Sequence, residues 1–145
     1  MRFVAKDFKE LTASEVYEIL KARAEIFVVE QGINYQDMDD IDYKSRHCFL
    51  EENGKTVAYL TAFYEDENKD VVHIGRVLSL QHNIGLGRLL MEYSMTDIKK
   101  HFKCSRIRLN SQKQAVGFYE KIGFKTVSLE FLIEDIVHLT MELDL

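Results

Sequence analysis

The stretch VVHIGRVLSLQHNIGLGRLLMEYSMTDIKKH, residues 71–101, decides the fold. Its first part predicts a buried strand, a short polar loop follows, and Ile84-Gly85-Leu86-Gly87 opens a predicted helix that runs to His101. The first N–H groups of a helix have no intrahelical partner, and the helix dipole adds partial positive charge at the same end. This strand–loop–helix unit therefore predicts a site for a phosphate or pyrophosphate, with glycine allowing close approach to the backbone. A tight turn without a ligand explains the two glycines equally well when they are taken alone.

Two familiar nucleotide-binding motifs are excluded at this position. A Walker loop requires Gly-Lys-Ser/Thr after its spacing, which is not found here. A dinucleotide fingerprint requires a third glycine, and Leu90 occupies that position. Any anion site in this stretch must be of another type.

Composition points to one soluble domain spanning residues 1–145, with 46% hydrophobic and 30% charged residues. The formal net charge of −5 argues against nucleic acid as a partner, because phosphate backbones are bound by clustered Lys and Arg. It favours a neutral or cationic substrate.

Cysteine usage and the N-terminus predict a cytoplasmic protein with no membrane contact. Cys48 and Cys104 lack metal-ligand spacing, so no metal site is expected, and they read as reduced, buried thiols. Residues 1–11 lack the apolar core of a signal peptide. No apolar run approaches the roughly 20 residues of a membrane helix.

The N-terminal third predicts a strand over residues 1–8 and then an amphipathic helix. Thr12 and Glu15 form a capping box at its start, and Gly32 is placed to stop the apolar run. Arg23 shares the helix face of the apolar residues and is expected to reach a carboxylate or the edge of the domain. The apolar residues of that face are Val16, Ile19, Leu20 and Phe27.

An acidic loop follows, containing Asp37, Asp39, Asp40 and Asp42. It does not fit a calcium-binding EF-hand, because Ile41 and Asp42 stand where that loop needs Asp or Asn and then Gly. Two interpretations stay open: a solvated loop, or an acidic rim that attracts a cationic amine to a pocket.

The remaining segments alternate strands and helices. Asn53-Gly54 predicts a hairpin turn between strands. The expected strands cover 47–50, 56–63, 105–110, 127–133 and 137–143, the last two forming a hairpin about Glu134-Asp135, with a short helix over 114–122. The prediction is an α/β fold with a mixed sheet.

Two segments together resemble the GNAT superfamily of N-acetyltransferases: IGLGRLLM (84–91) and NSQKQAVGFYEKIGF (110–124). The second matches the family pattern through Gln112, Ala115, Phe118, Tyr119, Gly123 and Phe124. Residues 16–42, His47 and the closing EDIVHLTM (134–141) are similar to the ElaA/YjcF-like branch, so the resemblance covers nearly the whole chain. It implies a single domain with a mixed, splayed β-sheet flanked by helices.

The chain departs from the family pattern at two places. His82-Asn83 occupies the position where the family's phosphate loop begins with Arg or Gln followed by Gly. The closing loop at 134–138 is also shortened.

The resemblance implies that acetyl-CoA, as co-substrate, lies between the splayed strands 76–80 and 105–110. A backbone N–H near Leu78 would stabilise the oxyanion, and Tyr119 would protonate the leaving thiolate. On the residues alone, a packed aromatic is the favoured interpretation of Tyr119, and it is the resemblance that favours the acid. The cofactor-binding residues implied are Leu78, Ser79, Leu80, His82, Asn83, Gly85, Leu86, Gly87, Arg88, Gln112 and Phe118.

The protonated amine must lose a proton before it attacks, and four residues are candidates for the base: Glu30, Glu134, His73 and His138. His138 alternates with Val137 and Leu139, which places it away from the core, either exposed or in a pocket wall. Glu30 suits a pocket floor or an ordinary helix end.

The resulting expectation is an acetyl-CoA-dependent N-acetyltransferase acting on an amine of a small molecule or peptide. The alternative is a non-catalytic acyl-CoA-binding or regulatory domain with the same fold. Tyr119 favours the enzyme and the His82-Asn83 loop favours the alternative. The sequence leaves the acceptor amine and the possibility of a homodimer open.

Overall fold

The computed structural model describes residues 1–65, 67, 69–82 and 84–145. Eight strands form one mixed sheet in the order β1-β2-β3-β4-β5-β8-β6, with β7 also paired to β8. The strands are β1 (Arg2–Asp7), β2 (Arg46–Glu52), β3 (Lys55–Tyr64), β4 (Val71–Ser79), β5 (Arg106–Gln112), β6 (Lys125–Thr126), β7 (Phe131–Ile133) and β8 (Ile136–Asp144).

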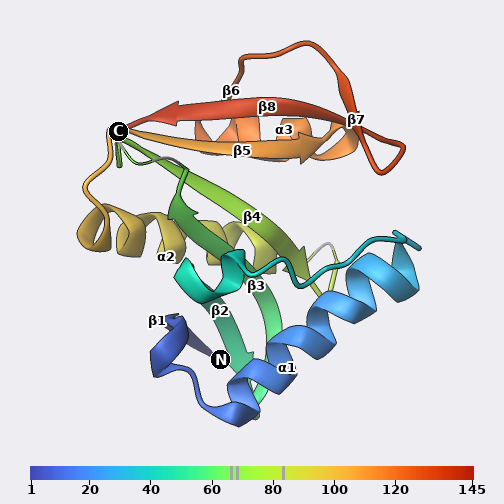
Figure 1. The fold of residues 1–145 in the computed structure, drawn as a ribbon, viewed down its shortest axis with the longest axis vertical. Helices are drawn as coiled ribbons and strands as arrows, with labels where there is room; N and C mark the ends of the chain where they lie inside the picture. The colour runs from blue at the N-terminus through green and yellow to red at the C-terminus, as the bar shows by residue number, and fades with distance from the viewer. Residues whose placement is uncertain (66, 68, 83) are drawn as a thin grey trace.

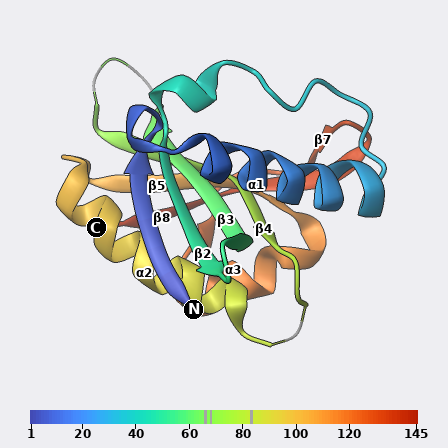
Figure 2. The ribbon, with the colours of Figure 1, turned by 90° about the horizontal axis from the view of Figure 1, so that it is seen from below.

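Helices cover both faces of this sheet (Figure 2). One face packs against α1 and the other against α2, so that Phe49 faces α1 while its neighbours Cys48 and Leu50 face α2. The helical elements are η1 (Phe8–Glu10), α1 (Ala13–Arg23), the π-helix η2 (Ala24–Glu30), η3 (Ile41–Lys44), α2 (Leu86–His101), η4 (Lys113–Ala115) and α3 (Val116–Ile122).

Local signals in the sequence produce the expected elements. The capping box at α1 forms, with the Glu15 N–H donating to Thr12 Oγ1 at 3.1 Å and the Thr12 N–H donating to Glu15 Oε1 at 2.8 Å. Asn53 and Gly54 both have positive φ in the β2–β3 hairpin. The fold class is confirmed as α/β with a mixed sheet.

The predicted strand over 127–133 is wrong in its first part. Residues 127–130 loop out opposite only Leu139 and Thr140, because Thr126 pairs with Met141 and Phe131 with His138. Ser128 Oγ accepts a hydrogen bond from the Thr140 N–H at 2.9 Å, so a side chain replaces the missing strand partner. Leu129 is left 89% exposed, although its alternation with apolar neighbours suggested a buried strand face.

The sheet divides between β4 and β5, as Figure 1 shows. These parallel strands pair over only four residues, from Val71 with Arg106 to Ile74 with Leu109. Beyond that point β4 contains a bulge, in which Arg76 and Val77 together stand opposite Leu60, and Arg76 has φ 51°. A bulge bends its strand and increases the local twist, and this separates the end of β4 from β5.

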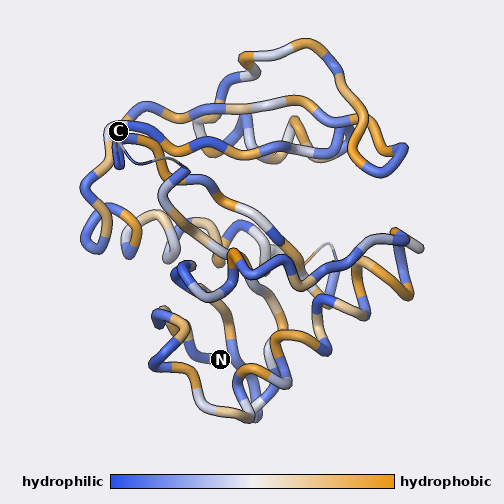
Figure 3. Tube along the Cα trace, in the orientation of Figure 1, coloured by the Kyte–Doolittle hydropathy of each residue, from blue (hydrophilic) through white to orange (hydrophobic). Residues whose placement is uncertain are grey.

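The core lies on the two sides of β1–β4 and under β5 and β8. In Figure 3 the hydrophobic positions follow the strands and the helix faces against them, whereas the segment between η2 and η3 is mainly hydrophilic. Cys48 is buried as expected, Cys104 is only half-buried, and both are free thiols. In the described part of the chain, no helix combines the length and apolar character needed to span a membrane.

Candidate active site

A cavity of about 440 Å³ lies where β4 and β5 separate. Its walls come from both halves of the sheet, from the end of η2 with the loop after it, and from α3 and the β7–β8 turn. Of the residues singled out from the sequence, it brings together His73, Gln112, Tyr119, Glu134 and His138. The divided sheet therefore collects acid and base candidates from distant parts of the chain.

Tyr119 enters this cavity from α3. The side chain is 7% exposed, and its ring packs edge-on against Phe118 and Phe124. Burial raises the pKa of the phenol, so it carries its proton at neutral pH. Both interpretations of Tyr119, packed aromatic and proton donor, are compatible with this position.

His138 is buried in the cavity wall, 8% exposed, so of its two interpretations the pocket wall is confirmed and the exposed side chain is wrong. Its alternation does point it away from the core under β8, but that face is the lining of the cavity. Nδ1 lies 2.7 Å from the carbonyl oxygen of Ile136. Because a carbonyl can only accept, Nδ1 carries the hydrogen, and Nε2 of the neutral ring holds the lone pair.

His73 lines the same cavity from β4. Its ring packs against Phe63, and Nδ1 lies 3.6 Å from Glu65 Oε2. Burial lowers the pKa of His73, against the opposing effect of the Glu65 carboxylate. His73 is therefore neutral at pH 7.

The backbone groups of β4 near Leu78 point to different sides of the strand. The Leu80 N–H donates to the Val57 carbonyl at 2.8 Å, and Leu78 stands opposite Tyr59 in the same antiparallel ladder. Backbone groups of alternate residues point to the same side of a strand, so the N–H of Leu78 also faces β3. The N–H and C=O of Ser79 face the opening towards β5 instead. The Leu78 side chain is buried in the core.

The start of α2 has the geometry of an anion site. Gly85 is the N-cap with φ 81°, and the first intrahelical bond runs from the Leu89 N–H to the Gly85 carbonyl. The N–H groups of Leu86, Gly87 and Arg88 thus lack intrahelical acceptors. The Leu86 side chain is buried in the core, so only its backbone can contact a ligand.

Side chains beside this helix start are placed differently from one another. Phe118 packs over Gly87, where an added Cβ would lie 3.5 Å from the ring. Arg88 is exposed and forms an ion pair with Glu92 on its own helix at 3.2 Å.

Glu30 and His82 bind each other rather than lining the cavity. His82 Nε2 lies 2.9 Å from Glu30 Oε1, and both side chains are about half exposed. Of the two interpretations of Glu30, the structure bears out the helix end. Asn83 lies outside the described residues.

Polar side chains connect η2 to β5 across the mouth of the cavity. Gln112 Nε2 donates to Gln31 Oε1 at 3.2 Å, and Gln114 Nε2 donates to Gln112 Oε1 at 2.6 Å. Glu134 is exposed at the rim with φ 47° in the β7–β8 turn. It is the only carboxylate among the described residues that line this cavity.

The acidic loop is divided: Asp37 and Asp42 face inward to an arginine, whereas Asp39 and Asp40 are exposed. Asp37 and Asp42 accept hydrogen bonds from Arg23, which is 1% exposed, and Asp39 contacts Arg76. Arg23 thus reaches carboxylates, as its place on an apolar helix face predicted.

Sequence reasoning missed several residues of the cavity wall. They include Tyr35, Arg76 and Asn110. One signal was available for the loop that carries Tyr35: Arg23 lies on an apolar helix face and therefore requires a carboxylate partner, which this acidic loop supplies. Arg76 carried no such signal, because a bulge cannot be read from strand alternation.

Comparison with known proteins agrees with this geometry. The family model "Acetyltransferase (GNAT) domain" matches residues 17–145. The UPF0039 protein C11D3.02c of Schizosaccharomyces pombe is 38% identical over 149 residues, covering 100% of this chain and 98% of that protein.

Two solved structures are also close to this one. Escherichia coli ElaA superposes with a TM-score of 0.90 at 29% identity, and an acyl-CoA N-acyltransferase from Pseudomonas aeruginosa with 0.88 at 31%. Each comparison covers 98% of this chain and 99% of the other. The chain therefore belongs to the GNAT acetyltransferase family and to the branch that contains ElaA.

Proposed function

We propose that this protein transfers an acetyl group from acetyl-CoA to an amine of a small molecule or peptide, by direct attack of the amine on the thioester. The observation that carries the proposal is the cavity at the β4–β5 separation, with Tyr119 buried in its wall. The strand β4 that lines this cavity leads through a short loop to the glycine-capped start of α2. Family membership supports the reaction type.

The donor would lie along β4 with its pyrophosphate at the start of α2. The N–H groups of Leu86, Gly87 and Arg88, which have no intrahelical acceptors, fit a phosphate, and the helix dipole adds to the attraction. The amide groups of the pantetheine arm would pair with the backbone of Ser79 rather than with Leu78, whose N–H faces β3. The same reasoning makes a backbone N–H of the bulge or of Ser79, and not that of Leu78, the proposed oxyanion donor.

Tyr119 is the proposed acid. Its raised pKa keeps the phenol protonated until thiolate charge develops on the leaving group, and it lies in the wall of the cavity. The apolar rings around it exclude water from that transfer.

His138 is the proposed base. Its Nδ1–H is held by the Ile136 carbonyl, which leaves Nε2 as the acceptor for a proton of the incoming ammonium. Glu30 is a weaker candidate, since it pairs with His82 outside the cavity lining. His73 and Glu134 line the cavity and remain the alternatives to test.

Incubation of the protein with acetyl-CoA and a panel of primary amines, with release of free CoA followed by a thiol reagent, tests the proposal. CoA release that requires both the amine and the protein, with the acetylated amine found by mass spectrometry, is the expected result. The Tyr119→Phe variant is the matched control, because it keeps the ring that packs against Phe118.

A non-catalytic acyl-CoA-binding domain is the second candidate, and the contact of His82, in the expected phosphate loop, with Glu30 of η2 favours it. This candidate predicts a rise in the melting temperature with acetyl-CoA but no amine-dependent CoA release. The absence of a thermal shift at millimolar acetyl-CoA would remove both candidates.

A further inference from the structure

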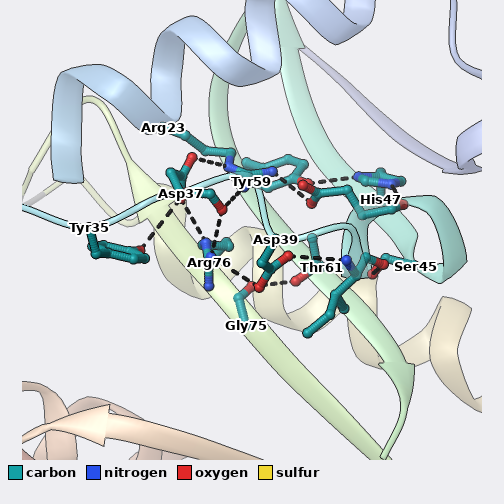
Figure 4. A network of polar contacts seen from close by, with 12 residues as sticks. Arg23, Tyr35, Asp37, Asp39, Ser45, His47, Tyr59, Thr61, Gly75 and Arg76 are labelled. Carbon is teal, nitrogen blue, oxygen red and sulfur yellow. Dashed lines mark hydrogen bonds and ion pairs between the residues drawn. The ribbon is translucent and has the colours of Figure 1, made fainter. Parts of the chain in front are cut away.

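Asp37 lies between two arginines that approach it from different elements (Figure 4). Arg23 Nε donates to Oδ2 of Asp37 at 2.8 Å, and Arg76 Nε donates to Oδ1 at 2.8 Å. Both guanidinium groups also donate to the Asp37 carbonyl oxygen, at 3.0 Å from Arg23 and 2.7 Å from Arg76. One residue of the loop therefore holds four hydrogen bonds from two cations.

Arg23 is the fixed side of this arrangement. It is 1% exposed in α1, and its third partner is Asp42 Oδ1 at 2.8 Å. A buried guanidinium is costly unless it is paired and its donors are satisfied. Arg23 thus fastens the loop to α1 at Asp37 and Asp42.

Arg76 is the side that reaches the active site. It is the bulge residue of β4, and its φ of 51° is unfavourable for a residue with a side chain. Its guanidinium lies over the ring of Tyr35, 5.4 Å from the centroid, and both residues line the cavity. Pairing between β4 and β5 ends at Ile74, immediately before this bulge.

We infer that Asp37 is a positioning residue for acyl transfer. It connects the β4 bulge to α1, because it binds Arg76 on one side and Arg23 on the other. It thereby fixes the cavity wall formed by Tyr35 and Arg76, and also the backbone donors that follow the bulge. The inference rests on the proposed function for its kinetic consequence, but the physical coupling it describes exists without turnover. Asp37 does not line the cavity, so it acts through Arg76.

The decisive variant is Arg76→Gly. Glycine adopts a φ of 51° without strain, so the bulge is retained while the guanidinium is removed. Arg76→Lys keeps the charge but cannot reproduce the two-point contact with Asp37. Asp39→Asn is the matched control, because Asp39 touches the same arginine at 3.3 Å but has no contact with Arg23.

In the kinetic arm, Arg76→Gly is expected to raise KM for the amine and lower kcat, for a loss of tenfold or more in kcat/KM. Binding of acetyl-CoA should weaken less than kcat/KM falls, because its pyrophosphate is proposed to bind at the start of α2 and only its pantetheine arm pairs with Ser79. Arg76→Lys should recover part of the loss, and Asp39→Asn should resemble the wild type. A purely structural Arg76 would instead reduce the active fraction and leave both KM values unchanged.

The second arm needs no activity. Amide hydrogen exchange over residues 33–42 and 75–79 should accelerate at least tenfold in Arg76→Gly and in Asp37→Asn, with α2 unchanged. Asp37→Asn tests the role of Asp37 directly. If this loss of charge beside the buried Arg23 prevents folding, Arg76→Gly still provides the decisive test. Unchanged exchange in Arg76→Gly overturns the inference. Accelerated exchange without amine acetylation by the wild type would contradict the proposed function alone.

Discussion

The ring of Tyr119 packs edge-on against Phe118, with centroids 5.1 Å apart and planes at 79°. This contact holds the ring in the cavity wall without using its hydroxyl group. Ring packing and proton donation can therefore be separated in one substitution.

Tyr119→Phe should lower kcat about a hundredfold and leave KM for acetyl-CoA nearly unchanged, because a general acid acts only in the chemical step. Steady-state kinetics on the first amine found to be acetylated measures this. A near-normal kcat with only a small change in stability would show that Tyr119 is a packing residue.

Gly87→Glu should abolish acetyl-CoA binding while the protein stays folded, because a carboxylate at the helix start repels the pyrophosphate. Gly87→Ala is the control. Its Cβ would meet Phe118 at an ordinary 3.5 Å, so the variant should stay folded and should weaken binding less than Gly87→Glu does. Calorimetric titration with acetyl-CoA distinguishes the two, and equal binding by both would place the anion site elsewhere.

His138→Gln should lower kcat/KM for the amine by about a hundredfold. The reason is that Gln cannot accept the proton that Nε2 of His138 receives. His73→Gln, which changes the other imidazole in the cavity, should leave kcat/KM close to the wild-type value. The reverse result would make His73 the base.

His47 should make the fold less stable in acid. Its Nε2 lies 2.9 Å from the Asp42 carbonyl oxygen and must carry the hydrogen, so Nδ1 accepts from the Tyr59 hydroxyl at 2.7 Å. Burial lowers the pKa of His47, with Arg23 acting in the same direction and Asp42 opposing it. The unfolded state then takes up a proton at a higher pH than the folded state.

This contribution to stability is present above the unfolded pKa of about 6.5 and is lost as the pH falls through the lower folded value, by at most about 1.4 kcal/mol per pH unit. Urea denaturation from pH 7.5 downward should therefore show a shallower loss for His47→Gln than for the wild type. His73, whose pKa is lowered as well, is present in both proteins and cancels in the comparison. Parallel pH curves for the two proteins would contradict the prediction.

Local signals predicted most of the architecture. The capping box at Thr12, the turn at Asn53-Gly54 and the glycine start of α2 act over a few residues, so the sequence displays them directly. The break at residues 127–130 depends instead on Ser128 replacing a strand partner for Thr140. This replacement of a backbone partner by a side chain depends on the neighbouring strand β8, so residues 127–130 show no periodicity that would reveal it.

The sequence predicted which types of residue form the candidate site better than it predicted how these residues are arranged. His138 was placed on the correct side of β8, but the sequence does not show that this side faces a cavity. Arg76 was missed because its importance comes from an extra residue in β4. A backbone donor near Leu78 was expected. The register of the ladder turns the N–H of Leu78 itself towards β3, whereas the N–H of the next residue, Ser79, faces away from β3.

The two parts of the sheet are joined by only four residue pairs, and they are also consecutive in the chain. Everything proposed to hold the donor's phosphates precedes residue 89, and the proposed acid and base both follow residue 110. Neither segment alone contains a complete set of reacting groups. The alignment of β4 with β5 over these four pairs therefore sets the distance between the acetyl donor and the acid. A substitution that disturbs this pairing should lower the rate of turnover before it lowers the helix content.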